Sequence, residues 1–160
     1  MSVPVPETAL AVHGFDDFEK GLLPVLRYFL MSFETPDSQA WQQAYAVASE
    51  RWGEAIGLAA AQALMKLLRA VLESRDGQYS FIDSFDLEFR GTVTPDEAAL
   101  LRMLHHMRRD QTPQAREAVA DVTCGQMDPH VIRAGLAFAS RFSAGQAVRR
   151  AETPRLRVVA

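Results

Sequence analysis

Apolar residues recur every three or four positions from Phe15 to Phe33, which is the period of an amphipathic helix. Pro24 lies inside this stripe, where it removes a backbone donor and its ring collides with the carbonyl group four residues earlier. We therefore expect either a kinked helix or two helices that meet near Gly21. Residues 28–33 leave almost no polar face, so this helix must be central to the fold or lie at an interface.

A second helical pattern follows and continues to about Glu73. Thr35 and Pro36 indicate its start, because threonine is a common N-cap and proline is favoured at the first helical position. The pattern is too long for one ordinary globular helix, and glycines weaken its middle. We expect a bend or break between Ser49 and Gly57.

Between residues 84 and 90 the period changes from that of a helix to that of a strand, because apolar residues alternate with charged ones. A single strand has no partner in a helical chain. We therefore expect an extended segment near 81–91 that lies on the core, pairs with a short neighbouring segment or pairs with a second copy of itself. The spacing of Phe81, Phe85 and Phe89 would also fit one face of a helix.

The strongest helix signals lie between Thr94 and Phe142. Three helix starts are each marked by a threonine or aspartate followed by proline, at residues 94–95, 112–113 and 128–129. Short connections between such helices make them fold back or cross as neighbours. This region therefore predicts a compact three-helix unit at the C-terminal end of the fold.

These patterns together predict an all-α protein, a single-domain bundle of about five to seven helices. We expect residues 14–145 to form the helical domain. Residues 1–13 contain prolines and no periodicity, so they predict an extended N-terminal tail, and residues 146–160 predict a flexible basic tail. The length of 160 residues and an apolar content of 48% suit a single hydrophobic core.

Polar residues interrupt every apolar stretch before it reaches the ~18 residues of a membrane span, so we expect no transmembrane helix. The single cysteine, Cys124, cannot form an internal disulfide. Residues 1–6 also lack the basic start and apolar stretch of a secretory signal. These features predict a cytoplasmic protein, and the excess of arginine over lysine with abundant alanine indicates a bacterial origin.

The adjacent pair His105 and His106 is the first place to consider a metal ion. Neighbouring helical residues point about 100° apart, so the two imidazoles do not chelate one ion from one helix face. Cys124 and His130 flank a turn, where an activated thiolate is conceivable. Cysteine is, however, among the most commonly buried residues, so we expect neither a metal site nor a nucleophile.

Other catalytic patterns are weak. Glu50 and Glu54 share a helix face, which is more typical of solvated surface than of an acid and base pair. The sequence contains no phosphate-binding loop, dinucleotide-binding motif or nucleophile elbow. We therefore expect no cofactor, and the sequence argues against an enzyme.

Charge is unevenly distributed along the chain. Residues 1–100 carry 7 lysines and arginines against 15 acidic residues, whereas residues 101–160 carry 10 arginines against 5 acidic residues. The C-terminal part therefore either contacts an anionic partner or merely complements the acidic part of the same fold. The candidate anion contacts are Arg102, Arg109, Arg149 and Arg150.

The leading interpretation is a helical protein–protein interaction or regulatory module that forms a homodimer or binds another protein. The candidate interface residues are Tyr28, Phe29, Phe33, Phe85, Leu87 and Phe89. One alternative is a nucleic-acid-associated regulator with a helix-turn-helix-like C-terminal unit, which the acidic chain and the apolar last helix disfavour. A further alternative is a small-molecule-binding bundle whose aromatic first helix lines a pocket.

Overall fold

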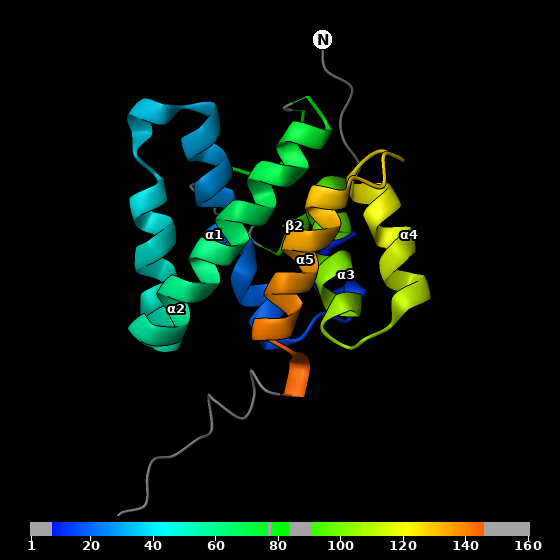
Figure 1. The fold of residues 1–160 in the computed structure, drawn as a ribbon. Helices are drawn as coiled ribbons and strands as arrows, with labels where there is room; N and C mark the ends of the chain where they lie inside the picture. Colours follow the sequence, from blue (N-terminus) through cyan, green and yellow to red (C-terminus); the bar gives the residue numbers. More distant parts are fainter. Residues whose placement is uncertain (1–7, 77, 84–90, 146–160) are drawn as a thin grey trace, which may run out of the picture.

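The computed structural model of the chain describes residues 8–76, 78–83 and 91–145. Five α-helices and a two-stranded sheet make up this part of the chain, which confirms the predicted all-α bundle (Figure 1). In chain order the elements are β1 (Thr8–Ala9), the 3-10 helix η1 (Leu10–His13), α1 (Asp17–Glu34), the 3-10 helix η2 (Pro36–Ser38), α2 (Trp41–Ser74), β2 (Thr92–Val93), α3 (Pro95–Met107), α4 (Thr112–Val122) and α5 (Pro129–Arg141).

Helix α1 is one continuous helix that contains Pro24, so of the two alternatives for this stripe the break near Gly21 is wrong. It starts with a capping box, in which Asp16 accepts from the Glu19 amide and the Glu19 side chain accepts from the Asp16 amide. Its buried residues pack against α2 and α3. The helix is therefore central, as its nearly complete apolar surface requires.

Helix α2 starts at Trp41, so the predicted start at Thr35 is wrong. The Thr35 side chain caps nothing, and the short 3-10 helix after it ends at Ser38, where the next residue, Gln39, has a left-handed φ of 52°. A left-handed residue interrupts a right-handed helix. The predicted break between Ser49 and Gly57 is confirmed, because Gly53 has a φ of 82° and a ψ of 159°.

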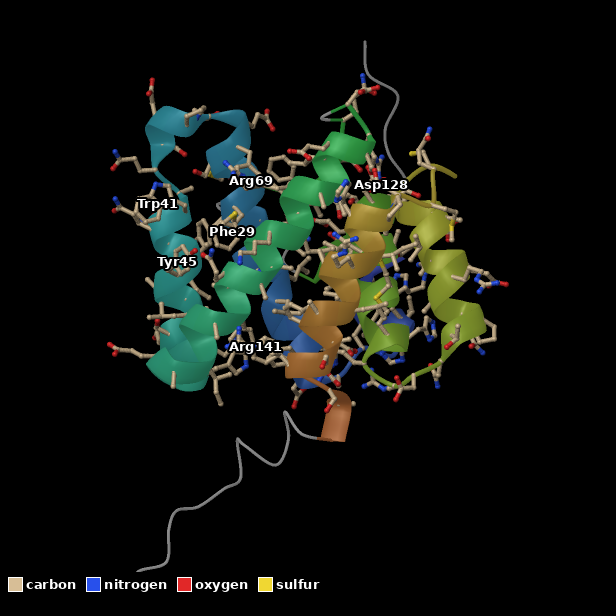
Figure 2. All side chains as sticks on the ribbon, viewed as in Figure 1. Phe29, Trp41, Tyr45, Arg69, Asp128 and Arg141 are labelled. Atoms are coloured by element: carbon tan, nitrogen blue, oxygen red, sulfur yellow. The ribbon has the colours of Figure 1, made fainter. Side chains whose placement is uncertain are left out.

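The two halves of α2 fold back on each other around Gly53, as Figure 1 shows in cyan and green. Tyr45 in the first half donates a hydrogen bond of 2.5 Å to Gln62 in the second. The first half runs antiparallel to α1, since Phe29 contacts Tyr45 and Phe18 contacts Trp52. Figure 2 shows Phe29 and Tyr45 between the two helices.

By length and composition, α2 qualifies as a membrane-spanning helix within the described part of the chain, although no such helix was expected. Of its most apolar window, 39% is buried inside the protein. The central helix of a soluble protein has the same composition. Here the buried positions of α2 contact α1 and α5, and Lys66 and Arg69 on the same helix are exposed.

Strands β1 and β2 pair antiparallel, with Thr8 opposite Val93 and Ala9 opposite Thr92. Part of the segment 1–13, predicted as a tail, is thus attached to the domain. Residues 78–83 are neither helix nor strand, and of the predicted extended segment near 81–91 only residues 81–83 and 91 are described. The alternating residues 84–90 and the predicted tail 146–160 lie outside the described residues.

The C-terminal unit of α3, α4 and α5 begins its helices close to where the sequence predicts. Thr94 and Glu97 form the predicted capping box of α3, and Asp128 accepts from the His130 amide at the start of α5. Helix α4 begins at Thr112, next to Pro113. Helix α4 packs on α3, and α5 lies against both α2 and α3 (Figure 1).

Candidate functional site

A buried ion cluster joins the first turn of α1 to the last turn of α3. Glu19 is its centre, with a side chain that is 0% exposed. Its carboxylate accepts hydrogen bonds from Arg108 and, at 2.7 Å, from Arg109, and it lies 2.8 Å from His105 Nδ1. It also accepts the Asp16 amide at 3.0 Å. This carboxylate is therefore fully engaged within the protein.

Asp16 supplies the second carboxylate of the cluster. It accepts from Arg108 Nη1 at 2.9 Å and from Arg109 Nη2 at 2.7 Å. Arg108 also donates through Nε to the Phe142 carbonyl at 2.5 Å, and its guanidinium lies 4.7 Å from the Phe18 ring centroid. The cluster thus holds α1, α3 and the end of α5 together, which is a structural role.

The carboxylates of this cluster have lowered pKa values. Burial alone would raise the pKa of Glu19, but hydrogen bonds from Arg109, His105 and the Asp16 amide outweigh burial and bring the pKa below 4.5. For Asp16 burial is outweighed in the same way by the Glu19 amide, Arg108 and Arg109, which bring the pKa below 3.8. Both groups therefore favour the folded state only while they are ionised.

We expect acid to destabilise the protein through this cluster. A carboxylate with a depressed folded pKa contributes its full stability above its unfolded pKa and loses it as pH falls through the folded value. The free energy of unfolding should therefore be steady well above pH 4.5 and fall as the pH drops below it. Urea denaturation across this range measures the decline, which should be shallower in Asp16→Asn. A free energy that stays constant down to about pH 3 would contradict the predicted coupling.

A second buried ion pair joins α1 to the start of α3. Arg27 donates through Nε and Nη2 to the Glu97 carboxylate at 2.7 and 2.9 Å, and through Nη2 to the Thr92 carbonyl at 2.7 Å. Glu97 also closes the Thr94 capping box. Such a two-point pair fixes orientation as well as distance, so it locates β2 and α3 on α1.

An apolar groove lies between α3, α4 and α5, with a cavity of about 200 Å³. We call this the α4–α5 groove. Its apolar lining residues are Met107, Ala115, Val119, Met127, Ile132 and Leu136. Leu136 is 51% exposed, one of the large apolar side chains that the described part of the chain leaves in water. Its neighbour Gly135 faces inward, where Met107 lies against it.

Polar groups form the rim of the groove. They are His106, Asp110, Gln111, Thr112 and Arg116. His106 Nδ1 lies 2.7 Å from the Gln111 side-chain oxygen, whereas the adjacent His105 faces Glu19. The two histidines thus point to different places, as their adjacent positions predict. An apolar centre with a polar rim is the usual anatomy of a protein-binding surface.

The predicted interface residues are scattered in the structure. Phe29 is 1% exposed and lies in the core against Phe33 and Tyr45, while Tyr28 and Phe33 are half-buried. Phe85, Leu87 and Phe89 lie outside the described residues. Of the large apolar side chains that the described residues leave exposed, none lies on α1; Leu136 lies at the α4–α5 groove, Trp41 and Leu58 on α2 and Val12 in η1.

The predicted anion contacts are largely occupied by the protein itself. Arg102 pairs with Asp121 at 3.8 Å, and Arg109 is bound in the ion cluster. Arg149 and Arg150 lie outside the described residues. Cys124 is exposed and has a left-handed φ of 55°. Within the described part of the chain, no three metal-binding side chains gather at one place.

Sequence reasoning did not identify Leu136 as a surface residue or Glu19 as the centre of an ion cluster. A signal for Leu136 was present, because α5 carries more apolar residues than its single buried face needs. No local signal existed for the Glu19–Arg108 pair, whose members are 89 positions apart.

Function must be argued here from the site itself, because a fold of packed helices supports many unrelated activities. Comparison with protein families, with curated proteins and with solved structures finds no significant match to this chain.

Proposed function

We propose that this chain is a helical interaction module that forms a two-fold homodimer through the α4–α5 groove. The observation that carries the proposal is Leu136, 51% exposed, beside an apolar cavity of about 200 Å³ that it helps to line. In a two-fold interface the same surface occurs on both sides, so one patch must carry both a protruding side chain and a hollow that receives its copy. The surface around Leu136 has this arrangement.

The lining of the groove suits an inserted leucine. Met107 and Met127 are flexible and polarizable, so they adapt to the shape of the side chain they receive. Complete burial of an exposed leucine contributes about 1.5–3 kcal/mol, and since Leu136 is 51% exposed, its insertion contributes about half of this per side chain. On the rim, Asp110 and Arg116 carry opposite charges, which allows the acid of one copy to face the base of the other.

The lone thiol of Cys124 fits a reducing compartment, and we propose that the dimer acts in the bacterial cytoplasm. Its role there would be that of an interaction or regulatory module, in which self-association presents two copies of the remaining surface to a further partner. Glu19 and Arg108 have the best-defined polar contacts of the described helices, but they are already paired with each other inside the fold.

Sedimentation velocity of the full chain tests the proposal, with Leu136→Glu as the disrupting variant. Leu58→Glu is the matched control, because Leu58 is 44% exposed on α2, away from the groove. We expect the wild type and Leu58→Glu to sediment as dimers at about 100 µM and Leu136→Glu as a monomer. Circular dichroism should show the same helix content in all three.

Two results would overturn the proposal. The first is a monomeric wild type at about 100 µM, a concentration at which interfaces of standard size are formed. The second is a dimer that persists in Leu136→Glu or that is lost equally in Leu58→Glu. Either outcome would remove the α4–α5 groove as the contact between copies.

A further inference from the structure

A second cavity, of about 380 Å³, lies on a different part of the molecule between α1 and the first half of α2. We call it the α1–α2 cavity. It is lined by Leu10, Lys20, Leu23, Pro24, Arg27, Tyr28, Val47 and Arg51. The lining residues from α1 are spaced by one or three positions and share one face of that helix. The two lining residues from α2 are four positions apart and share one face of α2. Two helix faces thus enclose the cavity.

Among the described residues, the lining of the α1–α2 cavity contains three cationic side chains and no acidic one. Lys20 and Arg51 are exposed, and neither side chain has a hydrogen bond or an ion pair to another described residue. Both line the same cavity, and Arg51 packs against Gly21, the residue after Lys20, since a Cβ added to Gly21 would sit 2.8 Å from Arg51 Cδ. An anion in this cavity would be attracted by both positive charges.

Arg27 adds a buried side chain to the same cavity. Its Nε and Nη2 atoms are bound to Glu97 and Thr92, which neutralises the charge and fixes the side chain. Arg27 thus contributes a rigidly held guanidinium to the lining of the cavity.

The remaining walls are apolar. The apolar lining residues are Leu10, Leu23, Pro24 and Val47. The volume of about 380 Å³ lies within the range of small-molecule sites, which combine apolar walls with a few placed polar groups. Inorganic anions would contact the charges but leave the apolar walls in water.

We propose that the α1–α2 cavity binds a small organic anion, in which one carboxylate or phosphate group meets Lys20 and Arg51 and an apolar body lies on Leu23 and Val47. The proposal is independent of dimerisation through the α4–α5 groove, because the two cavities share no lining residue. It assigns the module a ligand class, and ligand binding would stabilise the packing of α1 on α2.

Calorimetric titration of the full chain with phenyl phosphate, inorganic phosphate and benzyl alcohol tests the proposal. Phenyl phosphate carries both the anionic group and the apolar body, and each of the other probes carries one. We expect phenyl phosphate to bind with a Kd below about 1 mM and each of the other two to bind at least about tenfold more weakly.

Substitutions then locate the site. Lys20→Gln and Arg51→Gln should each weaken phenyl phosphate binding by about tenfold, the usual effect of losing a charge-assisted hydrogen bond. Lys66→Gln and Arg133→Gln are the matched controls, since both residues are exposed and lie outside the cavity. Val47→Phe should reduce binding by filling the cavity without any change of charge.

Absence of phenyl phosphate binding up to about 10 mM would overturn the proposal. So would equal affinity for inorganic phosphate, which would show general charge attraction only. Equal weakening in Lys66→Gln and Lys20→Gln would place the bound anion elsewhere on the surface. Lys20 and Arg51 are exposed and unpaired among the described residues, so their variants should fold and decide the question even if Val47→Phe does not fold.

Discussion

Glu19→Ala is expected to lower the free energy of unfolding by about 3–5 kcal/mol, the usual cost of removing one partner from a buried ion pair. The substitution leaves the Arg108 guanidinium, 0% exposed, with one carboxylate in place of two. It also removes the capping interaction with the Asp16 amide. Urea denaturation at pH 7 measures the loss.

Asp17→Ala is the control for this substitution. Asp17 is an acidic residue in the same first turn of α1, but it is exposed. Its effect should be limited to the helix dipole, about 0.3–1 kcal/mol. Equal losses in Asp17→Ala and Glu19→Ala would show that the buried cluster adds nothing beyond helix-end charge, which would contradict the structural role assigned to it.

The helix starts could be predicted because their signals are local. A capping residue and the amide it binds lie within three positions of each other. Thr94 and Glu97 therefore mark the start of α3 in the sequence itself. Gly53 likewise marks the break in α2 through its own backbone preference. Thr35 is followed by proline and aspartate like Thr94, but Ser38 stands where α3 has Glu97, and the left-handed residue Gln39 then delays α2 to Trp41.

The ion cluster and both cavities could not be predicted, because they depend on how distant segments meet. His105 and Glu19 are 86 positions apart, and no local sequence pattern around either residue indicates that the other will be its partner. From the sequence alone, Arg109 is expected to be a cation at the end of a helix that can bind an external anion. The packing of α3 on α1 gives it two internal carboxylates instead.

The same reasoning explains why Phe29, one of the predicted interface residues, is buried while Leu136 is exposed. Phe29 and Leu136 are both large residues on the apolar face of a helix, and the apolar pattern of the sequence around Phe29 is the stronger of the two. The folded-back first half of α2 covers Phe29, whereas within the described part of the chain nothing comparable covers Leu136. Burial is decided by the neighbouring helix, so the residue that stays exposed becomes visible only in the assembled fold.

The second position at which we expect a substitution to have a large effect is Gly57, where the two halves of α2 approach each other closely. Gly57→Ala should lower the free energy of unfolding by at least about 2 kcal/mol, although alanine is the better helix former. An added Cβ would overlap the Ala48 carbonyl oxygen and lie 2.6 Å from its carbon and 2.8 Å from Ser49 Cα. These are backbone atoms of the opposing half of α2, so relief requires the two halves to separate.

Gly135→Ala is the matched control, because Gly135 is also a buried helical glycine. Its added Cβ would lie 2.7 Å from Met107 Sδ and 3.2 Å from Met103 Cε, which belong to flexible side chains that can rotate away. The gain in helix propensity, about 1 kcal/mol, should then offset most of the cost. Chemical denaturation of both variants compares backbone with side-chain contact directly. If Gly57→Ala were as stable as Gly135→Ala, the two halves of α2 would not be packed at the distance that the structure shows.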